Sequence, residues 1–375
     1  MAARELYIGL MSGTSIDAID AALIRCTDQG CELLATLEHP IAPELRRDIA
    51  AISHPGADEI ERLGRLDRQL GVLFADAVLA LLASTRHGAD DIAAVGSHGQ
   101  TIRHRPPSAG NTPAFTLQIG DPNTIAELTG ITTVADFRRR DIAAGGEGAP
   151  LAPGFHAAAF ASEGRSRAIV NIGGIANITL LRGTHLVSGF DTGPGNTLLD
   201  HWTRRHRSLP YDRDGEWAAE GQVSAALLEQ LRSHPYLARR GPRSTGKEAF
   251  NLAWLDSCLH TLPALDPRDV QATLAEITAD SIASAITGAA EGVDEVYVCG
   301  GGARNTDLMR RLYRLLAPRR LDTTATLGMD PEWVEAAAFA WLAWRTLSGL
   351  AGNAAAVTGA SGARVLGGIY PAGGV

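Results

Sequence analysis

The sequence predicts an α/β protein made of two domains, and three observations support this fold class. The chain has 375 residues, 45% of them hydrophobic, which is enough for two packed cores. A pattern of three strands followed by a helix occurs near the N-terminus and again near the middle of the chain. A glycine-containing turn follows an apolar strand in each repeat and once more near residue 300. Three such turns at strand ends indicate a ligand site lined by backbone.

The first repeat starts at the N-terminus. Residues 6–24 predict two apolar strands around a short hydroxyl-rich turn, and residues 31–39 predict a third strand. A long amphipathic helix is predicted over 58–84, where leucines recur at helical spacing. A further strand ends near residue 97, and the segment 106–113, rich in Pro, Gly and Asn, is typical of a surface loop.

The second repeat follows the same order. Residues 168–181 predict two strands, residues 184–190 a third, and 196–206 the start of helical structure. We interpret this parallel as the trace of a duplication. Further along, a helix is predicted over 269–290, and a buried strand at 295–299 runs into a glycine turn with a helix over 305–316 behind it.

The boundary between the domains is predicted at about residues 133–150, where charge and glycine are mixed. The glycine-rich tail contains an apolar run at 364–370, which we expect to return to the first domain as a strand. The predicted domains are therefore 1–133 with 358–375, and 134–357. Clefts between domains commonly hold ligands, so the site is expected there.

Composition excludes several classes of protein. A net charge of −8 and a pI near 5.8 argue against a general affinity for nucleic acid or for an anionic membrane. Binding of small anionic ligands is compatible with this charge. The four cysteines form no C-x-x-C pair, so reduced thiols and a cytosolic setting are expected. The N-terminus has no signal-peptide pattern. The apolar stretch 333–357 contains Glu335 and Arg345, which favours a packed helix over a membrane span.

The first glycine turn is a candidate phosphate-binding turn. Gly13 lets backbone approach a ligand closely, while Ser12, Thr14 and Ser15 offer hydroxyl and N–H groups to anionic oxygens. Most Ser/Gly-rich hairpin turns are simply turns, and it is the recurrence of the pattern that favours a nucleotide. Asp17 and Asp20 follow this turn and could hold magnesium through water, with a solvated pair at a strand end as the alternative.

Asp191 is the strongest catalytic candidate. It follows an apolar strand in the segment Val187-Ser-Gly-Phe-Asp-Thr-Gly-Pro-Gly-Asn196, where glycines and a proline would hold its carboxylate rigidly. Rigid placement is what a general base requires. The alternative interpretation is a turn or N-cap aspartate that binds nearby N–H groups.

Other polar residues carry weaker signals. His98 lies between glycines after a strand and is a candidate for substrate contact, although an isolated histidine in a glycine-rich loop is more often structural. Gln100 and Thr101 carry neutral hydrogen-bonding groups that suit sugar hydroxyls. Arg138 begins a basic run with Arg139 and Arg140 that is either a solvated face or a clamp for a carboxylate. Lys247 lies in a segment without Walker spacing, so a surface charge is favoured.

Taken together, these segments closely resemble the anhydro-N-acetylmuramic acid kinase family of the actin-like ATPase and sugar-kinase superfamily. The resemblance spans nearly the whole chain and depends on the ordered set of its motifs. These are Gly9-Leu-Met-Ser-Gly-Thr-Ser-Ile-Asp17, Ser97-His-Gly-Gln-Thr101, Ala135-Asp-Phe-Arg138, Gly148-Ala-Pro-Leu151, Asn171-Ile-Gly-Gly174, Gly189-Phe-Asp-Thr-Gly-Pro-Gly-Asn196, Ser244-Thr-Gly246 and Gly300-Gly-Gly302.

The resemblance implies two actin-like, ribonuclease H-like domains that close around ATP and Mg²⁺, with the sugar in the cleft. It implies that the first two glycine turns grip phosphates and that the third lies near adenosine. The residues so implied for nucleotide binding are Ser12, Gly13, Thr14, Ser15, Ile16, Asp17, Ala18, Ile19, Asp20, Asn171, Gly173, Gly174, Gly300, Gly301, Gly302 and Asn305. Those implied for the sugar pocket are His98, Thr101, Arg138 and Glu335.

The family reaction hydrolyses an internal 1,6-anhydro bond and phosphorylates the freed O6, which yields N-acetylmuramic acid 6-phosphate and ADP in cell-wall recycling. By resemblance, Asp191 takes the proton of the attacking water. Two departures concern Ala18, where the family usually has glycine, and Glu147, where it usually has glutamine. We interpret both departures as changes that adjust the activity without abolishing it. The direct metal ligands are not assigned, and a homodimer is compatible with these expectations.

Two alternatives stay open at the level of sequence. One is a related sugar kinase that phosphorylates an ordinary hydroxyl without bond hydrolysis. The other is a nucleotide-dependent protein that assembles like actin.

Overall fold

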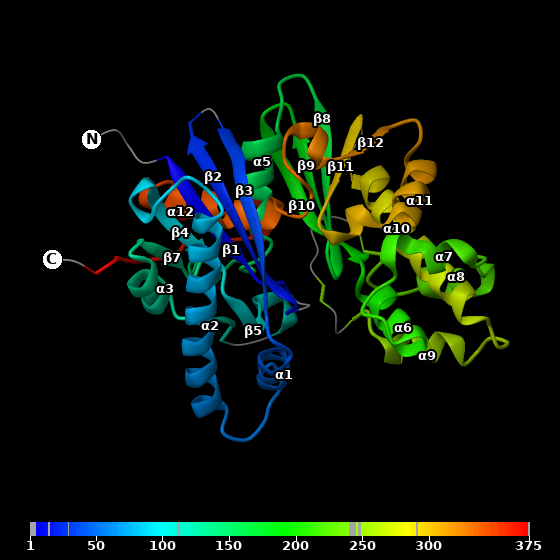
Figure 1. The fold of residues 1–375 in the computed structure, drawn as a ribbon. Coiled ribbons are helices and arrows are strands. Elements are labelled where there is room, and N and C mark those ends of the chain that lie inside the picture. The colour runs from blue at the N-terminus through cyan, green and yellow to red at the C-terminus, as the bar shows by residue number, and fades with distance from the viewer. Residues whose placement is uncertain are drawn as a thin grey trace. The chain divides into compact units, whose positions relative to one another are not determined.

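The computed structural model describes residues 5–13, 16–28, 30–110, 113–239, 245–246, 249–289 and 292–373. The chain divides into two compact units, Met1–Ala159 with Trp333–Val375, and Phe160–Glu332. Each unit has its own sheet (Figure 1). Each also has its own apolar core. The α/β class and the presence of two units are therefore as predicted.

The first unit contains a six-stranded sheet in the order β13-β7-β4-β1-β2-β3. Strands β1, β2 and β3 form an antiparallel meander, β4 and β7 run parallel to β1, and β13 pairs antiparallel with β7. Strands β5 and β6 form a separate hairpin. The elements are β1 (Leu6–Met11), β2 (Ala18–Thr27), β3 (Gly30–Pro40), α1 (Pro43–Ile52), α2 (Glu59–Ala83), β4 (Ile92–Ser97), β5 (Gln100–Arg105), β6 (Phe115–Ile119), α3 (Pro122–Thr129), β7 (Thr133–Ala135), α4 (Arg139–Ala143), α5 (Ala152–Phe160), α12 (Val334–Leu347), α13 (Ala355–Thr358) and β13 (Gly368–Tyr370).

Helices cover both faces of this sheet, because alternate side chains of its central strands point to opposite sides. Ile8 and Leu10 of β1 pack in one core with Leu70 and Phe74 of α2, all fully buried. On the other face, Gly9 lies against the backbone of α12, since an added Cβ would overlap the carbonyl oxygen of Ala336. The lack of a side chain at Gly9 thus allows the helix to approach the strand.

The second unit contains a five-stranded sheet in the order β10-β9-β8-β11-β12. Strands β8, β9 and β10 form an antiparallel meander, and β11 and β12 run parallel to β8. The elements are β8 (Ser166–Ile172), β9 (Ile175–Arg182), β10 (His185–Pro194), α6 (Thr197–Arg207), α7 (Glu216–Glu220), α8 (Ala225–Arg232), α9 (Leu252–Leu259), α10 (Pro267–Ala289), β11 (Glu295–Cys299), α11 (Thr306–Leu316) and β12 (Arg320–Thr323). Its main core joins the sheet to α10 and α11, and a second core gathers α6 to α10.

The two sheets share one topology. Numbered by their own order along the chain, β3-β2-β1-β4-β7 and β10-β9-β8-β11-β12 both have the order 3-2-1-4-5, with an antiparallel meander followed by parallel strands. This agreement supports the duplication inferred from sequence, and it gives each unit the ribonuclease H-like arrangement of an actin-like fold. The predicted tail strand is also confirmed, since β13 joins the sheet of the first unit.

The limits of the compact units differ from the predicted domains. The boundaries lie at 159/160 and 332/333, instead of 133/134 and 357/358. The segment 134–159 stays with the first unit because β7 pairs with β4, and 333–357 joins it because α12 packs on β1. Among the described residues, no helix has the length and apolar character needed to cross a bilayer, and the predicted packed helix within 333–357 is α12.

Candidate functional site

Part of the candidate phosphate-binding turn is held by a buried side chain of the first unit. Ser12 lies just after β1 and donates its hydroxyl proton to Gln100 Oε1 across 2.7 Å, with both residues buried. Gln100, predicted to face sugar hydroxyls, therefore links this turn to the segment that starts β5. Thr14 and Ser15 of the predicted turn lie outside the described residues.

The second half of the turn carries backbone strain. Ile16 has φ +58°, a conformation in which a β-branched residue is strained, and its N–H donates to Gly13 O at 3.2 Å. Ala18 is absent from the positive-φ residues, so its methyl group is tolerated where the family usually has glycine. Ile19 is fully buried in the core. Any contact of Ile19 with a nucleotide is thus limited to its backbone.

The two aspartates after the turn have different surroundings. Asp17 is exposed and forms an ion pair with Arg46. Asp20 lies within β2, paired in register with Met11, and is half-buried. The two residues are therefore not an equivalent pair of solvated carboxylates.

His98 and Arg138 form the polar centre of the first unit. The His98 ring contacts Gly99 O through Nδ1 at 2.8 Å, and its Nε2 accepts from Arg138 Nε at 3.0 Å. We assign the proton to Nδ1, since the carbonyl oxygen can only accept. Burial, followed by the Arg138 charge, holds the pKa of His98 well below its usual value. His98 is therefore a neutral acceptor that orients Arg138.

Arg138 is fixed by further contacts. Its Nη1 donates to Gly148 O at 2.8 Å. Burial lowers the pKa of Arg138 to about 10, while the negative charges of Glu335 and Asp141 act in the opposite direction. The alternative of a solvated basic face thus fits Arg139 and Arg140, which are exposed, and not Arg138. Thr101 lies on β5, where its hydroxyl accepts from Gln118 Nε2 at 3.1 Å.

Asp141 is a site-supporting residue that sequence reasoning missed. Its fully buried carboxylate accepts from Gly148 N, Asn353 Nδ2 and Thr358 Oγ1, each at 2.8 Å. Because Gly148 O is bound by Arg138, this network sets the position of the guanidinium. The one sequence feature that could have pointed to Asp141 was the nearby motif that starts at Gly148. Glu147, the departure beside it, accepts from the Ser108 hydroxyl at 2.6 Å.

Buried neutral histidines make the stability of the first unit depend on pH. Burial lowers the pKa of His156, on α5, to about 3, far below the 6.5 of an unfolded histidine. Between these values the unfolded chain binds the extra proton, so stability is present above pH 6.5 and is lost as pH falls. When the pH is lowered from 7 to 5, we expect the unfolding free energy of wild type to fall by about 2 kcal/mol more than that of His156→Gln. Urea titration at each pH measures the unfolding free energies. Equal losses in the two proteins would contradict this.

In the second unit, three polar side chains form a row across the sheet. Asn171 of β8 is in register with Asn177 of β9, which is in register with Asp191 of β10. Opposite residues of neighbouring strands point to the same face. Since Ile172, Ile178 and their neighbours fill the core with α10 and α11, the polar row lies on the other face of the sheet.

Asp191 is held in a strand, contrary to the turn or N-cap interpretation. The register of β10 shifts between Asp191 and Gly193, which marks a bulge of the kind that re-aims side chains. The N-cap of the following helix is Asn196. Asp191 Oδ2 accepts from Thr245 N at 2.9 Å, and its backbone oxygen accepts from Tyr236 at 2.7 Å. The carboxylate is half-buried.

The second and third glycine turns meet at one end of this sheet. Asn171 pairs with Cys299, so the turn after β8 and the turn after β11 are neighbours. At Gly300, with φ +79°, a Cβ would overlap Asn171 Oδ1. The carbonyl groups of Gly173 and Gly174 accept from Asn196 N at 2.8 Å and Gly195 N at 3.0 Å. The structure therefore brings together the predicted residues Asn171, Gly173, Gly174, Gly300, Gly301 and Gly302.

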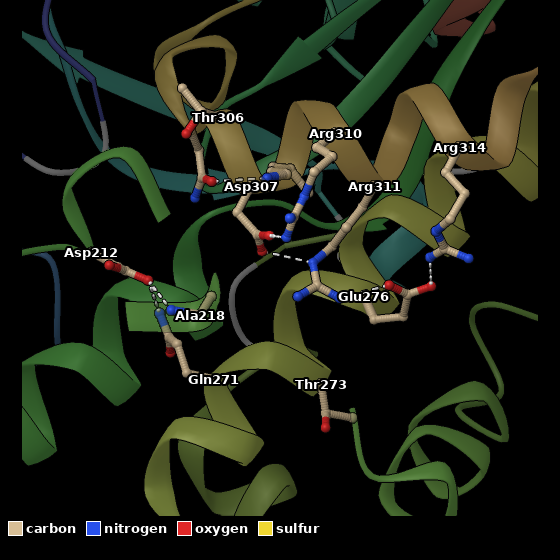
Figure 2. A network of polar contacts seen from close by, with 12 residues as sticks. Asp212, Ala218, Gln271, Thr273, Glu276, Thr306, Asp307, Arg310, Arg311 and Arg314 are labelled. Atoms are coloured by element: carbon tan, nitrogen blue, oxygen red, sulfur yellow. Dashed lines mark hydrogen bonds and ion pairs between the residues drawn. The ribbon is translucent and has the colours of Figure 1, made fainter. Parts of the chain in front are cut away.

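Asn305, also predicted to bind nucleotide, is the N-cap of α11, with Oδ1 accepting from Leu308 N at 2.9 Å. Behind it a buried charge network ties α11 to α10 (Figure 2). Arg311 donates to Asp307 at 2.7 Å and to Glu276 at 2.8 Å. Burial opposes ionisation of Glu276, but its hydrogen bonds with Arg311 and Arg314 outweigh this and lower its pKa. The network fixes the start of the helix that follows the third glycine turn, and sequence gave no signal for it.

These features define an actin-like α/β protein with a phosphate-turn candidate in one unit and paired glycine turns beside a carboxylate in the other. The family model described as Anhydro-N-acetylmuramic acid kinase matches residues 5–372. The chain belongs to that family, and it is a kinase that uses ATP.

Two curated relatives agree with this assignment. The chain is 54% identical over 370 residues to an anhydro-N-acetylmuramic acid kinase of Shewanella sp. (strain MR-4), covering 98% of this chain and 99% of that protein. It is 51% identical over 367 residues to the enzyme of that name from Pseudomonas putida, covering 98% and 99%. A solved structure of the activator of 2-hydroxyisocaproyl-CoA dehydratase from Clostridium difficile matches 92% of this chain and 96% of that chain, with 13% identity and a TM-score of 0.47.

Proposed function

We propose that this enzyme uses ATP and water to open the 1,6-anhydro ring of 1,6-anhydro-N-acetylmuramic acid and to phosphorylate O6. The products are N-acetylmuramic acid 6-phosphate and ADP, and the reaction serves the recycling of cell-wall sugar. The observation that carries this proposal is the family match over residues 5–372. The same match disfavours an actin-like assembly protein and a kinase for an ordinary hydroxyl.

Asp191 is the general base of the proposed reaction. Its carboxylate takes a proton from the water that attacks the anomeric carbon, the bond from that carbon to O6 breaks, and O6 attacks the γ-phosphoryl group. Support comes from its place at the β10 bulge, where Thr245 N orients one carboxylate oxygen at 2.9 Å. A base held in this way is directed at its proton before the substrate arrives.

The nucleotide is held mainly by backbone N–H groups in this proposal. The first hairpin, from Ser12 to Asp20, and the turn at Gly173 and Gly174 bind phosphate oxygens, and the Gly300 turn lies near adenosine. The Gly173 and Gly174 carbonyls already accept hydrogen bonds within the unit, which leaves N–H groups as the donors for phosphate. The Asn305 side-chain oxygen accepts from its own helix, so the group that Asn305 offers to the nucleotide in this proposal is its side-chain amide nitrogen.

Mg²⁺ belongs to the proposal as the partner of ATP. No group of three or more His, Cys, Asp or Glu side chains within the described ranges suits a metal ion. Asp20, half-buried on β2 after the first turn, would hold the ion through water, because Mg²⁺ keeps much of its hydration when it binds phosphates. The ion supplies charge neutralisation on the transferring phosphoryl group.

The sugar is recognised by residues of the first unit in this proposal. His98, Thr101, Arg138 and Glu335 line the pocket, and Arg138 meets the lactyl carboxylate. Support comes from the fixed, half-buried guanidinium, which His98 contacts through Nε and Nη2 and Gly148 O through Nη1. Each Nη keeps a second N–H for a carboxylate. A preorganised guanidinium suits bidentate binding of a carboxylate.

Arg138→Ala tests the sugar site. We expect the KM for the anhydro sugar to rise about 10- to 100-fold, as for loss of a charged hydrogen bond, while the KM for ATP changes little. Steady-state kinetics with each substrate varied in turn gives both values. The matched control is Arg139→Ala, because Arg139 is exposed and pairs with Asp136 at 3.5 Å. Equal changes in the two KM values for Arg138→Ala would contradict the assignment.

The reaction itself is tested in water enriched in heavy oxygen. The proposed chemistry places the label on the anomeric carbon of the product and none on the phosphoryl group. A kinase acting on an ordinary hydroxyl would incorporate no label. Unlabelled N-acetylmuramic acid 6-phosphate kept in the same water for the same time corrects for spontaneous anomeric exchange. Label no higher than in this control would refute the hydrolytic step.

A cytoplasmic location belongs to the same proposal, because ATP is supplied there. A homodimer is compatible with it and is checked by light scattering of the purified enzyme.

A further inference from the structure

Two cysteines face each other at the closed end of the β2–β3 hairpin. Cys26 and Cys31 are register partners in the antiparallel pair, next to the pair formed by Thr27 and Gly30. Both are free thiols, and their sulfur atoms lie 2.8 Å apart in a hydrogen bond. The next pair along the ladder, Arg25 with Glu32, is joined by an ion pair of 2.5 Å.

The backbone places these cysteines in the pair type that suits a covalent link. Cys26 N donates to Glu5 O at 2.9 Å, on the side of β1. In an antiparallel sheet the N–H and C=O of one residue point to the same neighbour, so Cys26 makes no ladder bond with Cys31. Such non-hydrogen-bonded pairs have Cα atoms about 4.5 Å apart, within the roughly 4.4–6.8 Å that disulfides span. Little backbone movement is then needed to join the two sulfurs.

We propose that Cys26 and Cys31 are a modification site at which a hydroperoxide produces a reversible cross-strand disulfide. The Cys31 thiolate attacks the peroxide, the O–O bond breaks, and a sulfenic acid forms with release of water. Cys26 then loses its proton and attacks the Cys31 sulfur, the S–O bond breaks, and a second water leaves. Two electrons from the two thiols thus reduce one hydrogen peroxide to two waters.

Exposure decides the order of the two steps. Cys26 is 2% exposed, whereas Cys31 is partly exposed. The hydrogen bond with Cys31, together with burial, also raises the pKa of Cys26, which favours Cys26 as the second sulfur to react.

The disulfide would not disturb the candidate phosphate-binding turn. The residues proposed to bind nucleotide in this hairpin end at Asp20, and Cys26 lies six residues further along β2. At about 3.3 Å per residue the separation is roughly 20 Å. We therefore expect turnover of the oxidised enzyme to stay within about twofold of the reduced enzyme.

Peptide mapping tests the proposal. The reduced full-length enzyme is treated with hydrogen peroxide, denatured, alkylated and digested with trypsin. Cleavage after Arg25 and Arg46 yields one peptide, 26–46, that contains both thiols and neither of the other cysteines. We expect this peptide to lose two hydrogen atoms and to escape alkylation, and a dithiol reductant to reverse both changes.

Three variants make the result specific. Cys26→Ser and Cys31→Ser should each abolish the loss of two hydrogen atoms, whereas the matched control Cys258→Ser should retain it. The proposal is overturned if peptide 26–46 stays fully alkylated, gains only oxygen on Cys31, or is found linked to a second chain.

Discussion

Asp191→Asn is expected to lower turnover by about 10²- to 10⁴-fold while leaving the KM for ATP nearly unchanged. The amide keeps the size of the side chain and can still accept from Thr245 N, which binds the carboxylate at 2.9 Å. It cannot take a proton from water, so only the chemical step should suffer. Initial rates of ADP formation with the anhydro sugar measure the change.

The matched control for this prediction is Asp76→Asn. Asp76 is an exposed residue of α2, in a different unit from Asp191, and the substitution removes the same charge. Its turnover should equal that of wild type. If Asp191→Asn keeps turnover within threefold of wild type, Asp191 is not the general base.

Gly9→Ala should destabilise the first unit by about 3 kcal/mol or more and yield mostly insoluble protein. An added Cβ would overlap Ala336 O and lie 2.6 Å from Ala340 N, both backbone atoms of α12. Backbone cannot rotate away as a side chain can, so the helix must move off β1. Gly96 of β4 has the same role, since a Cβ there would overlap Phe339 O.

The control for overpacking is Gly64→Ala in α2. Nothing lies within 4 Å of a Cβ at Gly64. Alanine in an exposed helix is favoured over glycine by up to about 1 kcal/mol, so this variant should be slightly more stable than wild type. Urea unfolding followed by circular dichroism compares the three proteins. A Gly9→Ala enzyme as stable as wild type would contradict the close packing of α12 on β1.

Local patterns predicted most of the fold. The hairpins β1–β2 and β8–β9 and the helices α2, α10 and α11 lie where strand patterns and helical spacing placed them. The domain limits were less accurate, because they depend on contacts between distant segments. Nothing within 333–357 indicates that its helix packs on Gly9, more than 300 residues earlier.

The sequence predicted those parts of the candidate site that consist of glycine turns and of an aspartate next to glycines. Glycine turns are visible because their backbone conformation restricts the residue type, as at Gly300. Asp141 was not visible, since its partners Asn353 and Thr358 are more than 200 residues away. The same is true of Glu276 and Arg311, whose pairing depends on how two helices meet. Residues that act through such partners cannot be recognised from one sequence.

The division of the first unit into two segments of chain has a consequence for biosynthesis. Residues 1–159 leave the ribosome long before Trp333–Val375, which contains the helix that covers β1 and β4. The nascent sheet therefore waits with one apolar face uncovered, while the continuous segment Phe160–Glu332 has all its strands and can fold first. During synthesis, the half of the molecule made first is the last to be completed.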